Sequence, residues 1–237
     1  MSYLMDVTRR LQALAGSQSE AFEVISRRYA EVISRGGVIH MFGCGHSSLI
    51  AQEAYYRAGG LVPVRPIMIE PLMLHQGAAM ASRNERTPGF VHPYLEKEDV
   101  KPEDAVLVIS TSGRNPAPVE AAEFFKEMGV YTTALTSLRY ADSQPSRMDS
   151  GKRLEDVAEN VIDMEVPVGD AVMKGKGTDY SPVSTVLGTA IIHELLTRTI
   201  QHLERSGNEV PIFKSGNVDG SDEHNQRMME HYTRIRF

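Results

Sequence analysis

The sequence predicts an α/β protein, a three-layer α/β/α sandwich around a doubly wound, mainly parallel, five-stranded sheet. Short apolar runs alternate along the chain with segments of helical period, and parallel strands need such helical crossovers between them. The chain has 237 residues, 41% of them hydrophobic, which suffices for one sizeable core. We therefore expect a single domain, with N-terminal helices at residues 1–37, the α/β core at 38–206, and a C-terminal tail and helix at 207–237.

The strands are expected where short apolar runs end at turn residues. They lie at residues 38–42, 61–68, 105–109, 131–136 and 161–166. Apolar residues at helical spacing mark the helices. These are expected at residues 3–34 with a break near 16–19, and at 47–58, 71–81, 119–128, 185–203 and from 222 onward. The polar stretch 137–160 is expected to be an exposed connection, and 210–213 a short extended piece.

Composition and charge argue against several classes of protein. Lys and Arg number 25 against 31 Asp and Glu, a formal charge of −6, so a nucleic-acid-binding surface is not expected. Cys44 is the only cysteine, which rules out an intrachain disulfide and agrees with a reducing compartment. No apolar stretch approaches the roughly 20 residues that span a bilayer, and the first ten residues lack an apolar signal core. We expect a cytoplasmic protein without nucleic-acid or membrane partners.

Two loops carry the main chemical signal. Residues 43–48 (GCGHSS) follow the first strand, and residues 110–115 (STSGRN) follow the third. Glycines let a backbone approach a ligand closely, while free amides, the helix dipole and serine hydroxyls favour an anion. Either loop alone is also compatible with an ordinary capped turn. Two such loops at strand ends can converge on one ligand where an open sheet reverses its order, so the pair predicts an anion site.

These two motifs, Gly-x-Gly-x-Ser and Ser-Thr-Ser-Gly, resemble those of the sugar isomerase (SIS) domain family. The resemblance covers about residues 3–205 and is nearest to uncharacterised SIS proteins labelled phosphoheptose isomerases. It implies a flavodoxin-like fold, a phosphosugar ligand and an aldose–ketose isomerase acting on a phosphorylated sugar or amino sugar. It also implies a homodimer or homotetramer formed through the N-terminal helices, in agreement with the apolar residues Leu4, Val7, Leu11 and Leu14.

The resemblance also implies which residues hold the ligand. In that family the positions of Ser47 or Ser48, Ser110, Ser112 and Asn115 hold the phosphate, although threonine is common where this chain has Asn115. Lys214 resembles tail lysines that close over the ligand. The complete predicted phosphate- and sugar-binding set is Gly45, His46, Ser47, Ser48, Ser110, Thr111, Ser112, Gly113, Asn115 and Lys214.

Isomerisation needs groups that move protons between adjacent carbons and oxygens. Glu70 and His75 follow the second strand, where an open sheet places its ligands, and their spacing is similar to that of the isomerase domain of glucosamine-6-phosphate synthase. Glu53 lies six residues after Ser47, as a glutamate does in several SIS isomerases. His193 lies on the helix corresponding to one with an active-site histidine in phosphoheptose isomerases. These four are the catalytic candidates, and each also has an ordinary explanation as a helix charge or a core histidine.

Other functions stay open at this point. The first loop approaches a dinucleotide-binding fingerprint, with Glu70 about 20 residues on, but Ser48 replaces its third glycine and the second loop has no part in that scheme. The same family resemblance is also compatible with a non-catalytic, phosphosugar-responsive regulator and with a phosphosugar lyase or etherase. His224 and His231 lack further metal ligands at suitable spacing, and no base partner marks Cys44 as a nucleophile. We expect no metal and no cofactor.

Overall fold

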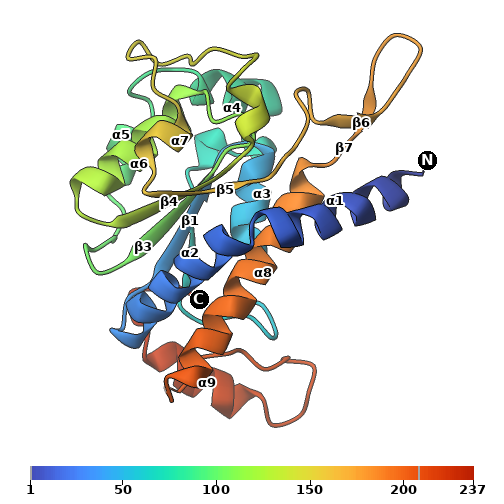
Figure 1. The fold of residues 1–237 in the computed structure, drawn as a ribbon. Helices are drawn as coiled ribbons and strands as arrows, with labels where there is room; N and C mark the ends of the chain where they lie inside the picture. The colour runs from blue at the N-terminus through green and yellow to red at the C-terminus, as the bar shows by residue number, and fades with distance from the viewer. Residues whose placement is uncertain (1, 208) are drawn as a thin grey trace.

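A parallel sheet of five strands in the order β2-β1-β3-β4-β5 forms the centre of the fold (Figure 1). The structure, a computed structural model, describes residues 2–207 and 209–237. The strands are β1 Ile39–Gly43, β2 Val64–Ile67, β3 Ala105–Ile109, β4 Tyr131–Thr136 and β5 Asn160–Asp163. All five predicted strands are confirmed, and β3 and β4 have the predicted bounds.

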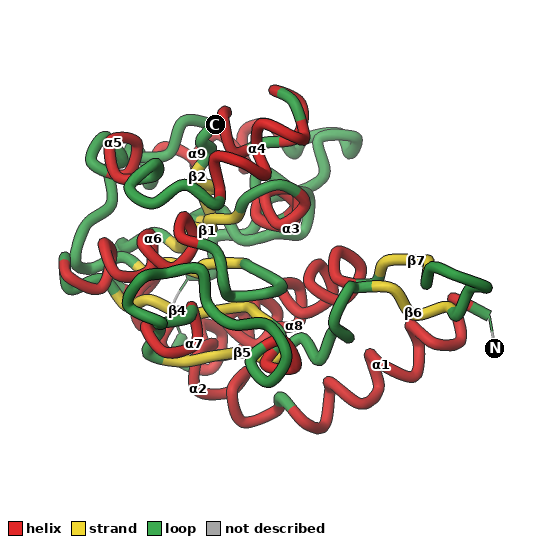
Figure 2. The backbone as a smooth tube through the Cα atoms, turned by 90° about the horizontal axis from the view of Figure 1, so that it is seen from above, coloured by secondary structure: helices red, strands yellow, loops and turns green. Residues whose placement is uncertain are grey.

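Helices cover both faces of this sheet (Figures 1 and 2). Leu107 of β3 packs into a core cluster with α1, α2, α3 and α8, whereas its neighbours Val106 and Val108 pack with α5, α6 and α7. The predicted three-layer sandwich is therefore confirmed. The helices are α1 Tyr3–Ser17, α2 Ser19–Ser34, α3 His46–Glu53, α4 Ala78–Glu85, α5 His92–Leu95, α6 Pro116–Glu127, α7 Leu154–Val157, α8 Ser184–Arg205 and α9 Asp222–Glu230. Across the described residues, no helix has the length and apolar character needed to cross a membrane.

The strand order reverses between β1 and β3. The chain runs from β1 to β2 on one side, then returns to place β3 on the other side of β1. Gly43 at the end of β1 is level with Ile109 at the end of β3. The two glycine- and serine-rich loops therefore leave the same edge of the sheet side by side, at the position where open α/β sheets bind their ligands.

The segment that follows β2 differs from the prediction. The single helix expected at 71–81 is wrong: two short 3₁₀ turns, η1 Glu70–Leu72 and η2 Leu74–Gln76, precede α4. Met73 has an extended backbone, with φ −100° and ψ 151°, and Gly77 has φ 123°. Neither conformation belongs to an α-helix, so the helix can begin only after Gly77.

Three further features were not predicted, and the first is the short helix α5. The stretch 137–160 contains the 3₁₀ turn η3 Leu138–Tyr140 and helix α7, and Arg153 and Leu154 within it are buried, so it is not simply an exposed connection. A hairpin of β6 Ala171–Met173 and β7 Tyr180–Pro182 projects beside α1 (Figures 1 and 2). Strands of three residues are too short to show an alternating pattern.

The C-terminal segment is tied to the opposite edge of the sheet by a buried carboxylate. Arg234 donates to both oxygens of Asp104, at 2.7 and 2.8 Å, and the Asp104 side chain is fully buried. The same carboxylate accepts the backbone amides of Val38 and Lys101 at 2.8 and 2.9 Å, and lies 3.2 Å from Nε2 of His40. Asp104 thus joins the starts of β1 and β3 to the end of the chain.

Candidate functional site

A cavity of about 530 Å³ opens at the edge where β1 and β3 end. This volume lies in the range of about 300–1,000 Å³ that is usual for small-molecule sites. Both predicted loops contribute to its wall, together with α4, the first turn of α8 and the root of the β6–β7 hairpin. Of the predicted ligand residues, those lining it are Gly45, His46, Ser47, Ser110, Thr111, Ser112 and Asn115.

The first loop turns sharply from β1 into α3. Gly45 has φ 56°, a conformation that favours glycine, and its amide donates to the carbonyl of Leu72 at 2.8 Å. The Ser48 hydroxyl donates to the carbonyl of Gly45 at 2.7 Å, so it stabilises the turn. Ser47 lines the cavity and Ser48 does not. Between these two predicted serines, the geometry therefore favours Ser47 as the ligand contact.

The second loop presents backbone donors. The Ser110 hydroxyl accepts the amide of Gly113 at 3.2 Å, which closes the turn, and Gly113 has φ 61°. Four amides of this loop have no acceptor among the described residues, those of Thr111, Ser112, Arg114 and Asn115. Successive amides of this kind form a concave site for an anion.

Glu85 is the functional candidate that sequence reasoning missed. It lines the cavity, and its Oε1 accepts the side-chain amide of Asn115 at 2.8 Å, while Arg147 donates to the other end of that amide at 2.5 Å. Burial raises the pKa of the Glu85 carboxyl, and the bond from Asn115 only partly opposes this. Glu85 lies four residues after Ala81, which also lines the cavity, so the two residues share one helical face. The predicted helix ended at residue 81 and therefore did not include Glu85.

Cys44 also lines the cavity, as a buried thiol. Burial raises its pKa well above the ordinary value, and the nearby carboxylate of Glu85 acts in the same direction. The thiolate, which is the reactive form, is therefore disfavoured. The sequence likewise offered Cys44 no base partner that would mark it as a nucleophile.

Asp170 and Tyr140 are further wall residues that were not predicted. Asp170 accepts the amides of Val183 and Ser184, at 3.0 and 2.7 Å, and the Ser184 hydroxyl at 2.7 Å. It thereby holds the first turn of α8 against the cavity, as a capping residue does. Burial raises the pKa of Tyr140, whose oxygen accepts the amide of Gly169 at 2.9 Å. Asp170 and Ser184 lie 14 positions apart, and this separation left no sequence pattern to find.

Two of the four predicted catalytic residues meet each other. Glu53 Oε2 lies 2.5 Å from Nε2 of His193, where α3 packs on α8, and Arg57 also pairs with Glu53. The His193 side chain is 41% exposed and that of Glu53 is 23% exposed. This pair is not part of the cavity wall in this chain.

The other two, Glu70 and His75, lie in an adjoining groove. This groove runs between α3 and the two 3₁₀ turns, with the exposed side chains of Leu49 and Met68 on its wall. Leu74 lines both the groove and the cavity. Ser48 of the first loop also lines this groove, so Glu70 and His75 share a wall with that loop but do not line the cavity itself.

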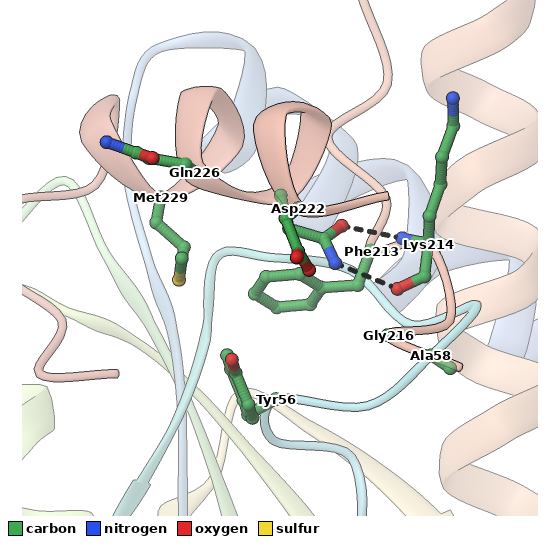
Figure 3. Close-up of a pocket in the computed structure, with 9 residues that line it drawn as sticks. Tyr56, Ala58, Phe213, Lys214, Gly216, Asp222, Gln226 and Met229 are labelled. Carbon is green, nitrogen blue, oxygen red and sulfur yellow. Dashed lines mark hydrogen bonds between the residues drawn. The ribbon is translucent and has the colours of Figure 1, made fainter. Parts of the chain in front are cut away.

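Lys214 lies in a different pocket, of about 390 Å³, at the opposite edge of the sheet (Figure 3). The Asn225 side chain holds the Lys214 backbone, accepting its amide at 2.8 Å and donating to its carbonyl at 3.0 Å. The lysine side chain extends away from the rings of Tyr56 and Phe213 (Figure 3). Next to it, Ile212 forms a bridge with Leu61, in accord with the predicted extended piece. Lys214 does not line the serine-loop cavity of its own chain.

Comparison with known proteins places this fold and paired-loop arrangement in a class. A family model described as SIS domain matches residues 2–137, which includes both loops. A UPF0309 protein from Geobacillus thermodenitrificans is 42% identical over 232 residues, covering 97% of this chain and 93% of its own length. The chain belongs to the SIS domain family and, within it, to the UPF0309 proteins.

Solved structures show the same fold at low sequence identity. A phosphoheptose isomerase from Francisella tularensis matches with a TM-score of 0.55 and 18% identity, over 84% of this chain and 95% of its own. The phosphoheptose isomerase GmhA from Neisseria gonorrhoeae matches with a TM-score of 0.52 and 16% identity, over 83% of this chain and 94% of its own. At such identity the likeness concerns the fold, so activity has to be argued from the site.

Proposed function

We propose that the protein binds a phosphorylated sugar or amino sugar in the serine-loop cavity and interconverts its aldose and ketose forms. The observation that carries the proposal is the convergence of the two serine-rich loops on one cavity where the strand order reverses. Free amides and hydroxyls on one wall suit a phosphate group. The volume of the cavity leaves room for a sugar beside it. The phosphoheptose isomerases that share the fold support this class of substrate.

Glu85 is proposed as the group that moves the proton. An isomerase needs a carboxyl whose pKa lies nearer to neutral pH than that of a free glutamate, and burial raises the pKa of Glu85. Its Oε1 is engaged by Asn115, which leaves Oε2 for the substrate. The Glu53–His193 pair and the Glu70–His75 groove remain proposed contributors, ranked after Glu85 because they do not line the cavity with the serine loops.

Thermal unfolding against a panel of sugar phosphates, with the parent sugars beside them, tests the proposal. A ligand that binds only the native state, at a concentration of 100 times its Kd, adds about 2.7 kcal/mol to the free energy of unfolding. This raises the Tm by several degrees. Ser112→Ala removes a hydroxyl from the proposed phosphate site, so we expect the Kd of this variant for the sugar phosphate to rise about tenfold or more. Glu85→Gln should keep binding and lose about 10²-fold or more of turnover, as loss of a general base does.

Ser19→Ala on α2, the same chemical change at a residue that does not line the cavity, is the matched control and should bind like the wild type. A wild-type protein that responds to no sugar phosphate would contradict the proposed ligand class. Binding in both wild type and Glu85→Gln without turnover in either would instead indicate a phosphosugar-responsive regulator, and cleavage of a substituted phosphosugar would indicate a lyase or etherase.

We also propose that the protein is a homodimer or homotetramer assembled through α1. Within this helix Val7 and Leu14 pack into the core of their own chain, whereas Leu4 and Met5 are 74% and 63% exposed. Exposed large apolar side chains on a helix are suited to an interface. The double variant Leu4→Glu/Met5→Glu is expected to sediment as a smaller species than the wild type. A monomeric wild type would refute this proposal.

A further inference from the structure

The carbonyl oxygens of the second loop are held from outside the cavity. Residues 144–155, which we call the brace segment, run behind this loop and donate to it. Three carbonyls of the loop accept backbone amides from beyond α6. The donors are the amides of Ser137, Leu154 and Arg147, at 3.0, 2.9 and 2.9 Å from the oxygens of Thr111, Gly113 and Arg114. Two of these three donors belong to the brace segment.

This anchoring sets the direction of the loop amides. In a planar trans peptide the carbonyl and the following N–H point in opposite directions. With the oxygens of Thr111, Gly113 and Arg114 turned toward their donors, the amides of Ser112, Arg114 and Asn115 must point the other way. These amides have no acceptor among the described residues, and Ser112 and Asn115 line the cavity. The brace segment thus keeps the amide donors aimed for an anion before any ligand arrives.

Arg153 holds the remaining carbonyl of the turn. Its side chain is buried, and Nη2 donates to the Ser112 oxygen at 2.5 Å, while Nη1 donates to the Gln144 carbonyl at 2.7 Å and Nε to Glu155 Oε1 at 2.5 Å. The planar guanidinium therefore joins the loop, the brace segment and α7 in one rigid fork. A lysine ammonium could not reproduce these three directions.

Glu155 completes the arrangement beside Gly113. A Cβ placed on Gly113 would lie 2.5 Å from Glu155 Oε2 and 2.8 Å from the Thr136 hydroxyl, so the loop packs directly on these groups. Arg153 and Glu155 neutralise each other away from the cavity, since neither lines it. Arg153 therefore acts on the loop geometry and not as a charge next to the ligand.

We propose that Arg153 is a positioning residue for the anion site. Its bond to the Ser112 carbonyl fixes the Ser112–Gly113 peptide, whose own amide closes the turn on Ser110, and the fixed turn keeps the neighbouring free amides in place for a phosphate monoester. The phosphate part of this inference rests on the proposed function. Preorganised donors bind more tightly because the loop does not have to be ordered when the ligand arrives.

Titration of ¹⁵N-labelled Arg153→Lys with inorganic phosphate, followed by amide chemical shifts, tests the proposal. We expect the Kd to rise at least tenfold relative to the wild type. The order parameters of amides 111–115, measured without ligand, should fall from the rigid value of about 0.85 to below about 0.6. Glu155→Gln, which weakens the hold on Arg153 without removing it, should shift both readouts in the same direction by less.

Arg65→Lys is the matched control. Arg65 is a partly buried arginine paired with Glu98 at 2.6 Å on β2, and it does not line the cavity. Arg65→Lys should lower the Tm. It should change the Kd for phosphate by no more than twofold and leave the order parameters of amides 111–115 unchanged. An unchanged Kd and rigid loop amides in Arg153→Lys would overturn the proposal and leave Arg153 a purely stabilising residue. If the wild type binds no phosphate but the Arg153→Lys loop loosens, the proposed function fails while the positioning of the loop stands.

Discussion

Substitution of Asp104 by alanine is expected to lower the free energy of unfolding by about 3 kcal/mol. This is the low end of the range for breaking a buried ion pair, because the Arg234 side chain is partly exposed. The alanine leaves Arg234, the amides of Val38 and Lys101, and His40 without their common acceptor. Urea denaturation at neutral pH measures the loss. Asp99→Ala removes an acid whose ion pair with Lys101 is about half exposed, and it should cost no more than about 0.5 kcal/mol.

The pH dependence of the same variant identifies the charge as the cause. Burial alone would raise the pKa of Asp104, but the hydrogen bonds from Arg234, His40 and the two backbone amides outweigh it and hold the pKa well below the ordinary value. A carboxyl with a depressed pKa contributes stability above its unfolded pKa of about 3.9 and loses it as the pH falls further. The difference between wild type and Asp104→Ala should therefore persist from pH 7 to about 5 and shrink below about pH 4. A difference that persists unchanged to pH 2 would argue against an ionic role.

Gly43→Ala is expected to remove ligand binding and to cost about 1–3 kcal/mol of stability, as overpacking does. A Cβ at this position would lie 2.6 Å from the carbonyl carbon and oxygen of Ser47. These are backbone atoms of the first turn of α3, so the turn as a whole has to move away from β1. Because Ser47 lines the cavity, the displacement carries the first loop away from the second. Urea denaturation and the sugar-phosphate thermal shift measure the two effects.

Gly16→Ala makes the same chemical change in α1, where nothing lies within 4 Å of the added carbon. Alanine is the better helix former, so this variant should gain about 0.5 kcal/mol and bind normally. Ligand binding that survives in Gly43→Ala would mean that the two loops need not approach each other as closely as they do here.

Local patterns in the sequence were sufficient to predict the strands of the central sheet. Residues 105–109 (AVLVI) are buried on both faces and appear as a continuous apolar run, whereas the equally buried residues 131–136 (YTTALT) are rich in β-branched and aromatic residues. The two serine-rich loops begin where the first and third strands end, and the switch-point rule predicted that they would meet. Seven of the predicted ligand residues line the resulting cavity because each is adjacent to a strand whose position could be predicted.

The tertiary structure decided which other side chains join that cavity. Glu85 reaches it because Gly77 delays the start of α4, and Asp170 does so from the root of a hairpin too short to show a strand pattern. Lys214, in contrast, is held at the opposite edge of the sheet.

The sequence by itself determined the parallel sheet and the position of the two loops, because hydrophobic period and turn residues act over a few neighbouring positions. Only the tertiary structure decided the support of the site, the hold of Arg153 on Ser112 and of Arg234 on Asp104. These contacts join residues 41 and 130 positions apart. A hydrogen bond between distant residues depends on how the whole chain packs, and it leaves no periodic trace in the sequence.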